Sequence, residues 1–223
     1  MSLPLYCSNI LLDQPFLTAN DFTISFTYTM NTSGTDPILN NGFSVFFIDG
    51  SVSTLSGGGS GPGLGVVSQG GSHGRPQPVS KVNGVFATVG FDIIGTFSQI
   101  NTTTSFSTGL VNPNPNSIAL RISPNFTYVY SSYLNLSGYT IPLNPNLYGP
   151  LGPAATPEAY QTVRVCVRKN FSEINVYSLA NETYIKLATF NFYLSSLPLN
   201  AKVGIGYSGD TLFQVQNLTV NYT

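Results

Sequence analysis

The stretch that decides the class of fold is residues 22–30, which read Phe-Thr-Ile-Ser-Phe-Thr-Tyr-Thr-Met. Large apolar side chains occupy every second position, and Thr or Ser fills the positions between them. A repeat of two residues is the period of a β-strand that has one face in a core and the other in water. Residues 43–48, Phe-Ser-Val-Phe-Phe-Ile, form instead a continuous apolar run between Asn41-Gly42 and Asp49-Gly50. Such a run between turn residues predicts a central strand that is buried on both faces.

Strand patterns continue through the rest of the chain. The same criteria predict strands near residues 64–67, 85–93, 118–122, 126–130, 162–168, 173–178, 184–192, 202–207 and 212–222. In residues 162–168 the valines share one face, which leaves Cys166 on the more polar face. In residues 212–222 the apolar positions change parity between Val215 and Leu218, and a bulge near Asn217 would absorb that slip. No stretch predicts a helix longer than one turn.

These roughly eleven strands predict an all-β fold, a two-sheet antiparallel β-sandwich or jelly roll. We expect a single domain across residues 1–223, because sandwiches of about 200–250 residues commonly form one domain. The side chains expected to fill the space between the two sheets are Phe22, Ile24, Phe26, Val45, Phe47, Phe91, Val163, Val165, Val203, Ile205, Val215 and Val220.

Charge is scarce in this sequence. Its 223 residues include 8 Lys and Arg and 9 Asp and Glu, a charged fraction of 8% against about 25% in an ordinary soluble domain. The net charge of -1 provides no positive field for phosphate backbones, so we expect no nucleic-acid partner. The 22 Gly and 15 Pro argue against a helical bundle, whereas 42% hydrophobic residues suffice for a packed core.

The sequence shows no targeting or membrane segment. Residues 1–16 lack a basic segment ahead of an apolar run and lack a small-residue cleavage site, so we expect no signal peptide. No stretch approaches the roughly 18 apolar residues of a membrane helix, so we expect no membrane insertion. Cys7 and Cys166 lack metal-ligand spacing, and two free thiols or one disulfide both remain open.

A segment rich in Gly and Pro, residues 138–158, is too long to be a turn. Its prolines fix φ and remove backbone donors, which predicts an extended surface arm. A loop without a partner and a docking arm both fit this composition.

Catalytic constellations are missing from the sequence. A retaining glycosidase needs two carboxylates about 5 Å apart, and the glutamates Glu158, Glu173 and Glu182 all lie more than two residues from any Asp. His73, the single histidine, lies in a Gly-rich loop without a Cys nucleophile near it in sequence. Residues 57–61 are Gly-rich but lack the Lys of a phosphate loop. We therefore expect no enzymatic activity.

An ordered series of motifs resembles the L-type (legume-like) lectins. Residues 41–48 are followed by a Gly-rich loop that ends in Gly-Pro-Gly-Leu-Gly-Val-Val at 61–67, and then by Val-Gly-Phe-Asp at 89–92, in the order of that family's motifs. Residues 21–26 and 202–209 are similar to its first and last strand motifs, so the resemblance covers most of the chain. Residues 90–98 are similar to a microbial variant found in bacterial surface proteins and in structural proteins of bacterial and algal viruses. The resemblance implies a concanavalin A-like jelly roll.

The same resemblance implies carbohydrate binding through four loops at one end of the concave sheet. Amide groups suit vicinal hydroxyls, glycine lets main-chain donors approach closely, and an aromatic ring packs on the apolar side of a sugar. The Asn41 amide would bond the hydroxyls, and the main chain at Gly61 or Gly63 would approach the ring closely. Tyr207 or Phe97 would pack on the apolar side of the sugar. The predicted carbohydrate-binding residues are Asn41, Gly61, Gly63, Asp92, Phe97, Tyr207, Ser208, Gly209 and Asp210.

The family's calcium and transition-metal pair is not expected in this chain. Gly90 replaces a glutamate ligand, Thr96 an asparagine and Ile100 an aspartate, and no histidine follows. A hard cation takes six or more oxygen ligands, usually with several carboxylates. Asp92 alone cannot supply them, which argues against even a single Ca²⁺ near it, and we expect it to cap a turn or bond a neighbouring loop. We predict no metal and no cofactor.

Two functional hypotheses remain. The first is a glycan-binding module for host recognition or adhesion, favoured by the retained Asn41 and Gly63 loops. The second is a structural protein of a virus particle or surface layer that uses the fold only as a scaffold, favoured by the low charge and the 138–158 arm. We predict a non-enzymatic lectin-like module on a virion or extracellular surface. Its partners would be glycans or other structural proteins, in a homo-oligomer or a larger assembly.

Overall fold

The computed structural model describes residues 6–31, 42–56, 64–66, 82–92, 97, 117–122, 129–130, 161–180, 182–191, 193–194, 196–209 and 212–222. The strands in these residues are β1 (Tyr6–Leu17), β2 (Phe22–Asn31), β3 (Gly42–Asp49), β4 (Val85–Asp92), β5 (Ser117–Ile122), β6 (Val129–Tyr130), β7 (Gln161–Val167), β8 (Glu173–Ala180), β9 (Thr183–Asn191), β10 (Asn200–Gly209) and β11 (Leu212–Tyr222). A 3-10 helix, η5 (Lys169–Phe171), is the one helix in this part of the chain. Within it, no helix has the length and apolar character needed to cross a bilayer.

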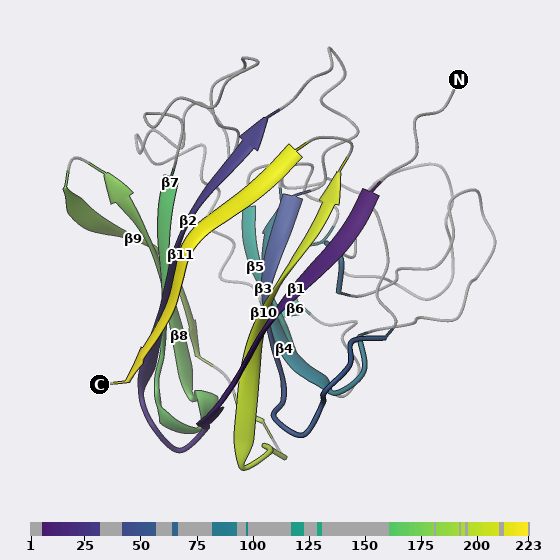
Figure 1. The fold of residues 1–223 in the computed structure, drawn as a ribbon. Helices are drawn as coiled ribbons and strands as arrows, with labels where there is room; N and C mark the ends of the chain where they lie inside the picture. The colour runs from purple at the N-terminus through teal and green to yellow at the C-terminus, as the bar shows by residue number, and fades with distance from the viewer. Residues whose placement is uncertain are drawn as a thin grey trace, which may run out of the picture.

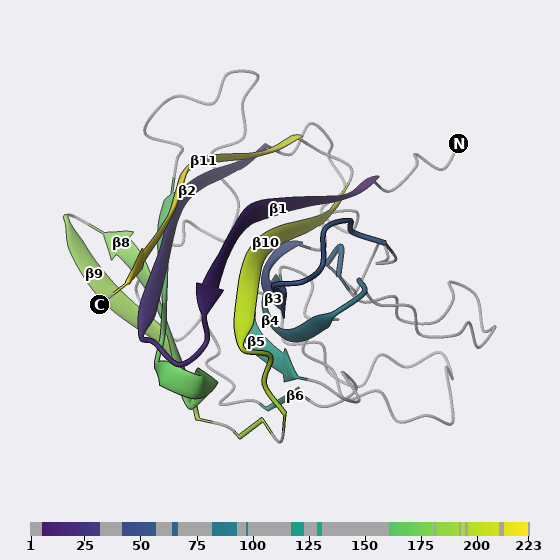
Figure 2. The same cartoon turned by 60° about the horizontal axis from the view of Figure 1, so that its bottom comes forward.

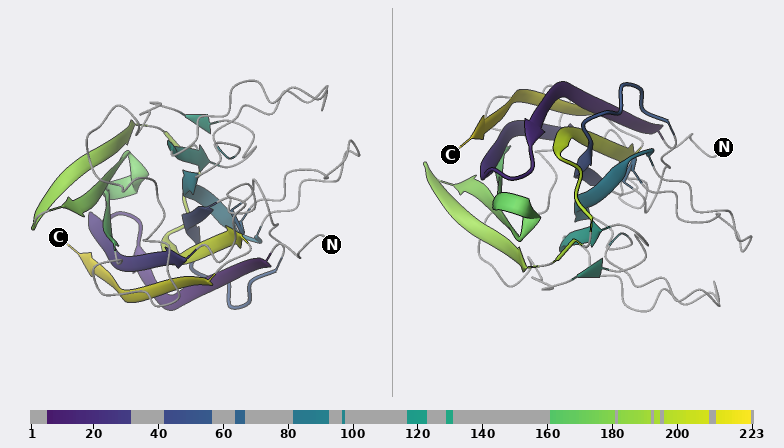
Figure 3. Two further views of the ribbon diagram at one scale, coloured as in Figure 1. Left: turned by 90° about the horizontal axis from the view of Figure 1, so that it is seen from above. Right: turned by 90° about the horizontal axis from the view of Figure 1, so that it is seen from below.

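The strands form two antiparallel sheets that pack face to face. Sheet A has six strands in the order β1-β10-β3-β4-β5-β6, and sheet B has five in the order β11-β2-β7-β8-β9. Figure 1 shows sheet B at the left and sheet A at the right, and the turned view in Figure 2 separates their edges. Seen from above and below, the two sheets remain distinct layers (Figure 3). The predicted two-sheet antiparallel sandwich is confirmed.

The inner faces of the two sheets enclose an aromatic and aliphatic core. The predicted strand at 22–30 is β2, whose Phe22, Ile24 and Phe26 are buried as expected. Ten of the twelve predicted core residues are buried, whereas Val215 and Val220 of β11 are partly buried at the edge of sheet B. The predicted slip in β11 is also confirmed, because its register with β2 shifts between Gln216 and Thr219 and Asn217 has a φ of 53°.

Two predictions about local structure are corrected. Strand β1 was missing from the sequence-based set, and its register with β10 is interrupted between Leu12 and Phe16, around Pro15. Residues 64–66 form a turn and not a strand, because Leu64 and Gly65 have φ angles of 48° and 82°, outside the extended region. The proposed arm at 138–158 lies outside the described residues.

The outer face of sheet A is covered by the chain itself. We call the covering residues 51–56, 64–66, 82–84 and 97 the cover segments. The side chains of β3 are buried on both faces from Gly42 to Ile48, as the sequence predicted. On the outer face, Phe46 and Ile48 pack with Val66 and Val82, and Phe97 packs with Leu64 and Ala119.

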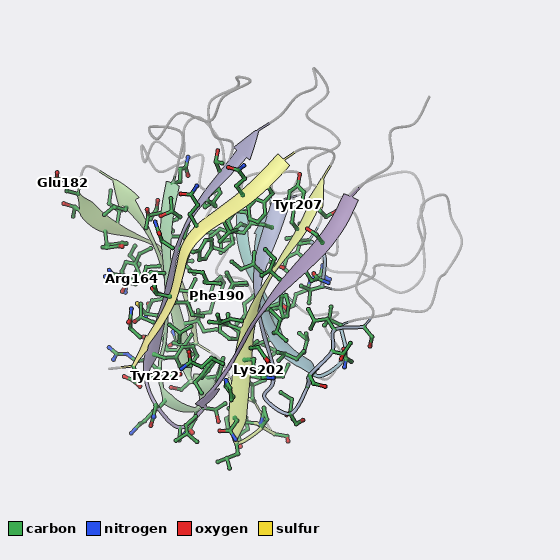
Figure 4. The ribbon with its side chains drawn as sticks, viewed as in Figure 1. Arg164, Glu182, Phe190, Lys202, Tyr207 and Tyr222 are labelled. Carbon is green, nitrogen blue, oxygen red and sulfur yellow. The ribbon has the colours of Figure 1, made fainter. Side chains whose placement is uncertain are left out.

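The outer face of sheet B is polar and has no such cover among the described residues. Its positions on β2 are Thr and Ser, and most of them are half-buried. Arg164 of β7 lies over the ring of Tyr184, with its guanidinium carbon 3.6 Å from the ring centre (Figure 4). Cys166 on the same face is partly exposed, and its thiol is free. Of the two alternatives, free thiols or a disulfide, this agrees with the first.

The lower end of the sandwich in Figure 1 is closed by η5. Asn170 and Phe171 have φ angles of 55° and 52°, and the buried Phe171 ring lies against Phe22, Phe47 and Phe86. Burial of this ring offsets the cost of two consecutive left-handed residues, which is about 1–2 kcal/mol each.

Candidate functional site

The strand register brings several predicted site residues to one end of sheet A. Ser208 of β10 pairs with Gly42 of β3, Gly42 pairs with Asp92 of β4, and Asp92 pairs with Ser117 of β5. We call Ser208, Gly42, Asp92 and Ser117 the end row. Because neighbouring strands lie about 4.8 Å apart, the first three residues span about 10 Å, the size of one or two sugar rings.

The remaining predicted residues flank the end row in sequence. Asn41 directly precedes Gly42, and Asp210 directly follows Gly209, the last residue of β10. Asn41, Gly61, Gly63 and Asp210 lie outside the described residues. Their proposed contacts to a sugar therefore stay predictions.

Tyr207 lies in the core and not at a ligand surface. It is 4% exposed, and its ring stacks on Phe213 with 4.9 Å between ring centres and 6° between ring planes (Figure 4). Because side chains alternate along β10, Tyr207 shares the inner face with Val203 and Ile205, while Ser208 takes the outer face. The expectation that Tyr207 offers a ring face to a sugar is corrected. Ser208 is itself fully buried, so the expectation that its side chain contacts a sugar is corrected as well.

Phe97 is also buried, with 0% of its surface exposed, which corrects its expected role as an open stacking platform. The guanidinium carbon of Arg121 lies 4.3 Å from the Phe97 ring centre. Arg121 Nε donates to the Phe97 carbonyl oxygen at 3.0 Å, and Nη2 donates to the same oxygen. The Phe97 ring occupies the space that a Cβ on Gly90 would need, so this glycine permits the close contact.

The turn at Leu64–Val66 is held on the sheet one row below the end row. Ser44 Oγ donates to the Leu64 carbonyl at 2.9 Å, and the Val82 N–H donates to the Val66 carbonyl at 2.8 Å. A Cβ on Gly206 would lie 2.6 Å from the Leu64 oxygen, so the turn fits only because this position has no side chain. Gly206, Ser44, Gly90 and Ala119 are register neighbours and form a row of small residues across four strands.

A second buried cation holds the cover at the opposite end of β10. Lys202 Nζ donates to Asp13 Oδ1 at 2.6 Å and to the Val52 carbonyl at 2.9 Å. Lys202 and Tyr207 lie toward opposite ends of this strand in Figure 4. Sequence reasoning missed Arg121, Ser44 and Lys202. The available signal for Arg121 was a single charge in the otherwise apolar run Ile-Ala-Leu-Arg-Ile at 118–122.

The described residues show no metal-binding cluster. Among them, no group of three or more His, Cys, Asp or Glu side chains could hold a metal ion. Ser208 of the end row is buried, so any hydrogen bonds to a hydroxyl-rich ligand would have to come from the residues that flank the end row in sequence.

Comparison with known proteins identifies the fold. No protein-family profile matches the sequence, and the search of curated proteins finds no match. Among solved structures, the chain is similar to peanut lectin in complex with a nine-residue peptide (TM-score 0.57, 15% identity, covering 100% of this chain and 84% of that chain). It is also similar to the Bauhinia forficata lectin in complex with GalNAc (TM-score 0.56, 13% identity, covering 99% and 82%).

A further similar structure is lectin UEA-II complexed with galactose (TM-score 0.52, 15% identity, covering 99% of this chain and 82% of that chain). All three matches extend over nearly the whole chain and over most of each lectin. The expected resemblance is therefore confirmed at the level of the fold: this chain has the concanavalin A-like β-sandwich of the legume L-type lectins.

Proposed function

We propose that this protein is a non-catalytic carbohydrate-binding module whose site lies at the end of sheet A that carries the end row. We further propose that it works on the surface of a virus particle or a cell, in host recognition or adhesion. The observation that supports the site is the register of three adjacent strands, which aligns Ser208, Gly42 and Asp92. The chain segments that carry Asn41 and Asp210 thus meet the sheet at the same end.

The similar structures support the ligand class. Two of them are complexes with a sugar, GalNAc for the Bauhinia forficata lectin and galactose for lectin UEA-II. At 13–15% identity these likenesses establish the fold alone, so the ligand of this chain is part of the proposal.

The residue types at this end suit a sugar that is held mainly by hydrogen bonds. The Asn41 amide can donate to one hydroxyl and accept from another, and main-chain groups at Gly61 and Gly63 can come close to the ring. Each such contact contributes about 0.5–1.5 kcal/mol net. With Tyr207 and Phe97 buried, aromatic stacking from these two residues is not part of the site.

The test is an array of immobilised galactose, N-acetylgalactosamine, glucose, mannose, fucose and their common disaccharides. We expect the wild-type protein to bind a subset of these glycans and Asn41→Ala to weaken that binding several-fold, with an unchanged Tm. Asn20→Ala, an exposed asparagine between β1 and β2 at the other end of the sandwich, should bind like the wild type. The absence of binding to every glycan on the array would reject the proposal.

A second candidate function is a scaffold in a larger assembly. Exposed apolar side chains support it, since Tyr193 and Leu199 expose 84% and 73% of their surface in the connection between β9 and β10. Large exposed apolar residues and few charges are features of surfaces that become buried between proteins. Light scattering should then show an assembly in which deletion of residues 139–156 or Leu199→Ser lowers the molecular mass. A monomer at all concentrations would reject this candidate.

A further inference from the structure

We propose that Arg121 is a positioning residue of the carbohydrate site. Its guanidinium fixes Phe97 on the outer face of sheet A and, through Phe97, holds the Leu64–Val66 turn directly below the end row. This inference rests on the proposed function for its final step, the effect on glycan binding. The structural step, from Arg121 to the turn, can be tested by itself.

The first link is the contact between Arg121 and Phe97. Arg121 extends from β5 beneath the cover and is 1% exposed. A buried charge is costly unless it is well hydrogen-bonded, and a charged donor makes stronger bonds than a neutral one. Two guanidinium nitrogens of Arg121 donate to the main-chain oxygen of Phe97, and the guanidinium also covers the ring. Both the main chain and the side chain of Phe97 are therefore held by one residue.

The second link is the contact between Phe97 and Leu64. The Phe97 ring and Leu64 Cδ1 are the atoms nearest to an ideal Cβ on Gly90, and the two side chains cluster with Ala119. Both side chains thus lie directly on the backbone of β4. If Phe97 left this position, Leu64 would lose the buried surface against which it packs.

The third link is the strain in the turn. Leu64 has a φ of 48°, a left-handed conformation that is unfavourable for a residue with a Cβ. Such a conformation persists only where its surroundings enforce it. The enforcing contacts are the Ser44 hydrogen bond, the Val82 hydrogen bond and the packing of Leu64 on Phe97. Gly63, a predicted sugar contact, directly precedes Leu64 in sequence.

Arginine suits this role better than any other cation. A planar guanidinium can stack on a ring and use two nitrogens at once, whereas a lysine ammonium is a compact point charge. We therefore expect the Leu64–Val66 turn to be held less firmly in Arg121→Lys than in the wild type, and least firmly in Arg121→Met. The matched control is Arg164→Lys, which changes a guanidinium that also lies over an aromatic ring, Tyr184, but on the outer face of sheet B.

Amide hydrogen exchange followed by NMR tests the structural step. The reporter is the Val82 N–H of the neighbouring cover segment, which donates to the Val66 carbonyl and is released when the turn separates from residues 82–84. We expect Val82 to exchange at least about tenfold faster in Arg121→Met, by a smaller factor in Arg121→Lys, and at the wild-type rate in Arg164→Lys. Amides of β2 and β7 should keep their wild-type rates in all three variants.

If Arg121→Met does not fold, Phe97→Leu serves instead, because it removes the ring and leaves the guanidinium in place. We expect Val82 exchange to accelerate there as well. The inference is overturned if Val82 exchanges at the wild-type rate in Arg121→Lys and in either Arg121→Met or Phe97→Leu. It is equally overturned if the amides of β2 and β7 accelerate as much as Val82, since the effect would then be a general loss of stability.

Binding to the same immobilised glycans tests the last step. We expect Arg121→Lys to weaken binding several-fold. Val165→Ala, a core change in sheet B that also lowers stability, should leave binding unchanged at a temperature where both variants are folded. Equal weakening in Val165→Ala would overturn the assignment of Arg121 to positioning. If the wild type binds no glycan, the proposed function fails, and the Val82 rates still decide whether Arg121 holds the turn.

Discussion

The outer faces of the two sheets are built in opposite ways. On sheet A most outer positions are small or apolar, with the buried cations Arg121 and Lys202 among them, and the cover segments bury this face completely along β3. On sheet B the outer positions of β2 are Thr and Ser, and the cations Arg164 and Lys186 lie over the rings of Tyr184 and Tyr177. In the described part of the chain, sheet B thus has one buried face, whereas the central strand β3 of sheet A is buried on both faces.

This difference shows how a β-sandwich can place loop segments accurately. On sheet A, side chains of the sheet donate to main-chain oxygens of the cover: Ser44 to Leu64, Arg121 to Phe97 and Lys202 to Val52. Each bond satisfies a main-chain oxygen of the cover, and those of Leu64 and Phe97 lie in buried surroundings, where carbonyl groups require a partner. The same polar residue types on sheet B are partly exposed to water and carry no cover.

The largest contrast should come from aromatic side chains on the two outer faces. Phe46→Ala on β3 removes a fully buried ring and should cost about 3–5 kcal/mol of the free energy of unfolding. Tyr177→Ala on β8 removes a half-buried ring and should cost at most about 1 kcal/mol. Urea unfolding measures both values. Equal costs would mean that the cover does not bury sheet A in solution.

The next contrast concerns space between sheet A and the cover. Gly206→Ala places a Cβ 2.6 Å from the Leu64 oxygen and 2.8 Å from Ser44 Oγ, so it should cost about 1–3 kcal/mol. Ser25→Ala on the outer face of β2 should change stability by no more than about 0.5 kcal/mol. Thermal unfolding checks both. A neutral Gly206→Ala would contradict the close approach of the turn to β10.

The two lysines on the outer faces offer a smaller contrast. Lys202→Met removes the donor to the Val52 carbonyl and to Asp13 and should cost about 1–2 kcal/mol, because these bonds are charged and partly buried. Lys186→Met on β9 changes an exposed lysine and should stay within about 0.5 kcal/mol. Urea unfolding of the two variants measures the difference. A Lys202→Met variant as stable as Lys186→Met would show that this cation does not hold the cover.

The smallest effect is expected from an exposed ion pair that belongs to neither face. A hydrogen bond from Arg168, followed by one from the Lys169 N–H, lowers the pKa of Asp21 below its ordinary value of 3.8. A lowered folded-state pKa stabilises the fold above the unfolded value, and this contribution is lost as the pH falls through the folded value. Asp21→Asn should therefore be slightly less stable than the wild type at pH 7. That difference should shrink as the pH falls below 3.8 and vanish once the pH lies below the lowered folded-state pKa.

Thermal unfolding between pH 2 and pH 7 measures this difference, and Glu182→Gln at the exposed tip of the β8–β9 hairpin is the control (Figure 4). Glu182→Gln should follow the wild-type curve throughout. A constant deficit of Asp21→Asn down to pH 2 would contradict the ion-pair explanation.

Most of the fold could be predicted from the alternation of apolar and polar residues along single strands. Strand β2 and the parity change in β11 could be predicted because their polar faces meet water, and β3 because both of its faces are apolar. Strand β1 was not predicted because Asp13 and Pro15 interrupt the alternation of apolar and polar residues along it. The turn at 64–66 was predicted as a strand because an apolar Leu-Gly-Val segment does not reveal that Leu64 has a positive φ.

The candidate site was less accessible to sequence reasoning. Tyr207 has the same parity as Val203 and Ile205, which were expected in the core, so its burial could have been predicted from the strand alone. The burial of Arg121 could not be predicted, because strand periodicity places this residue on the outer face of β5 and only the cover segments bury it. The end row required the register of four strands, which no single segment encodes.

The most direct test of the central claim is an NMR titration of the wild-type protein with the strongest glycan from the array. We predict that the amides of Gly42, Asp92, Ser208 and Gly209 shift as the glycan is added. The amides of Ser25, Arg164 and Tyr177, on the outer face of sheet B, should keep their positions. Shifts confined to sheet B, or none at the end row with saturating glycan, would contradict a carbohydrate site at this end of sheet A.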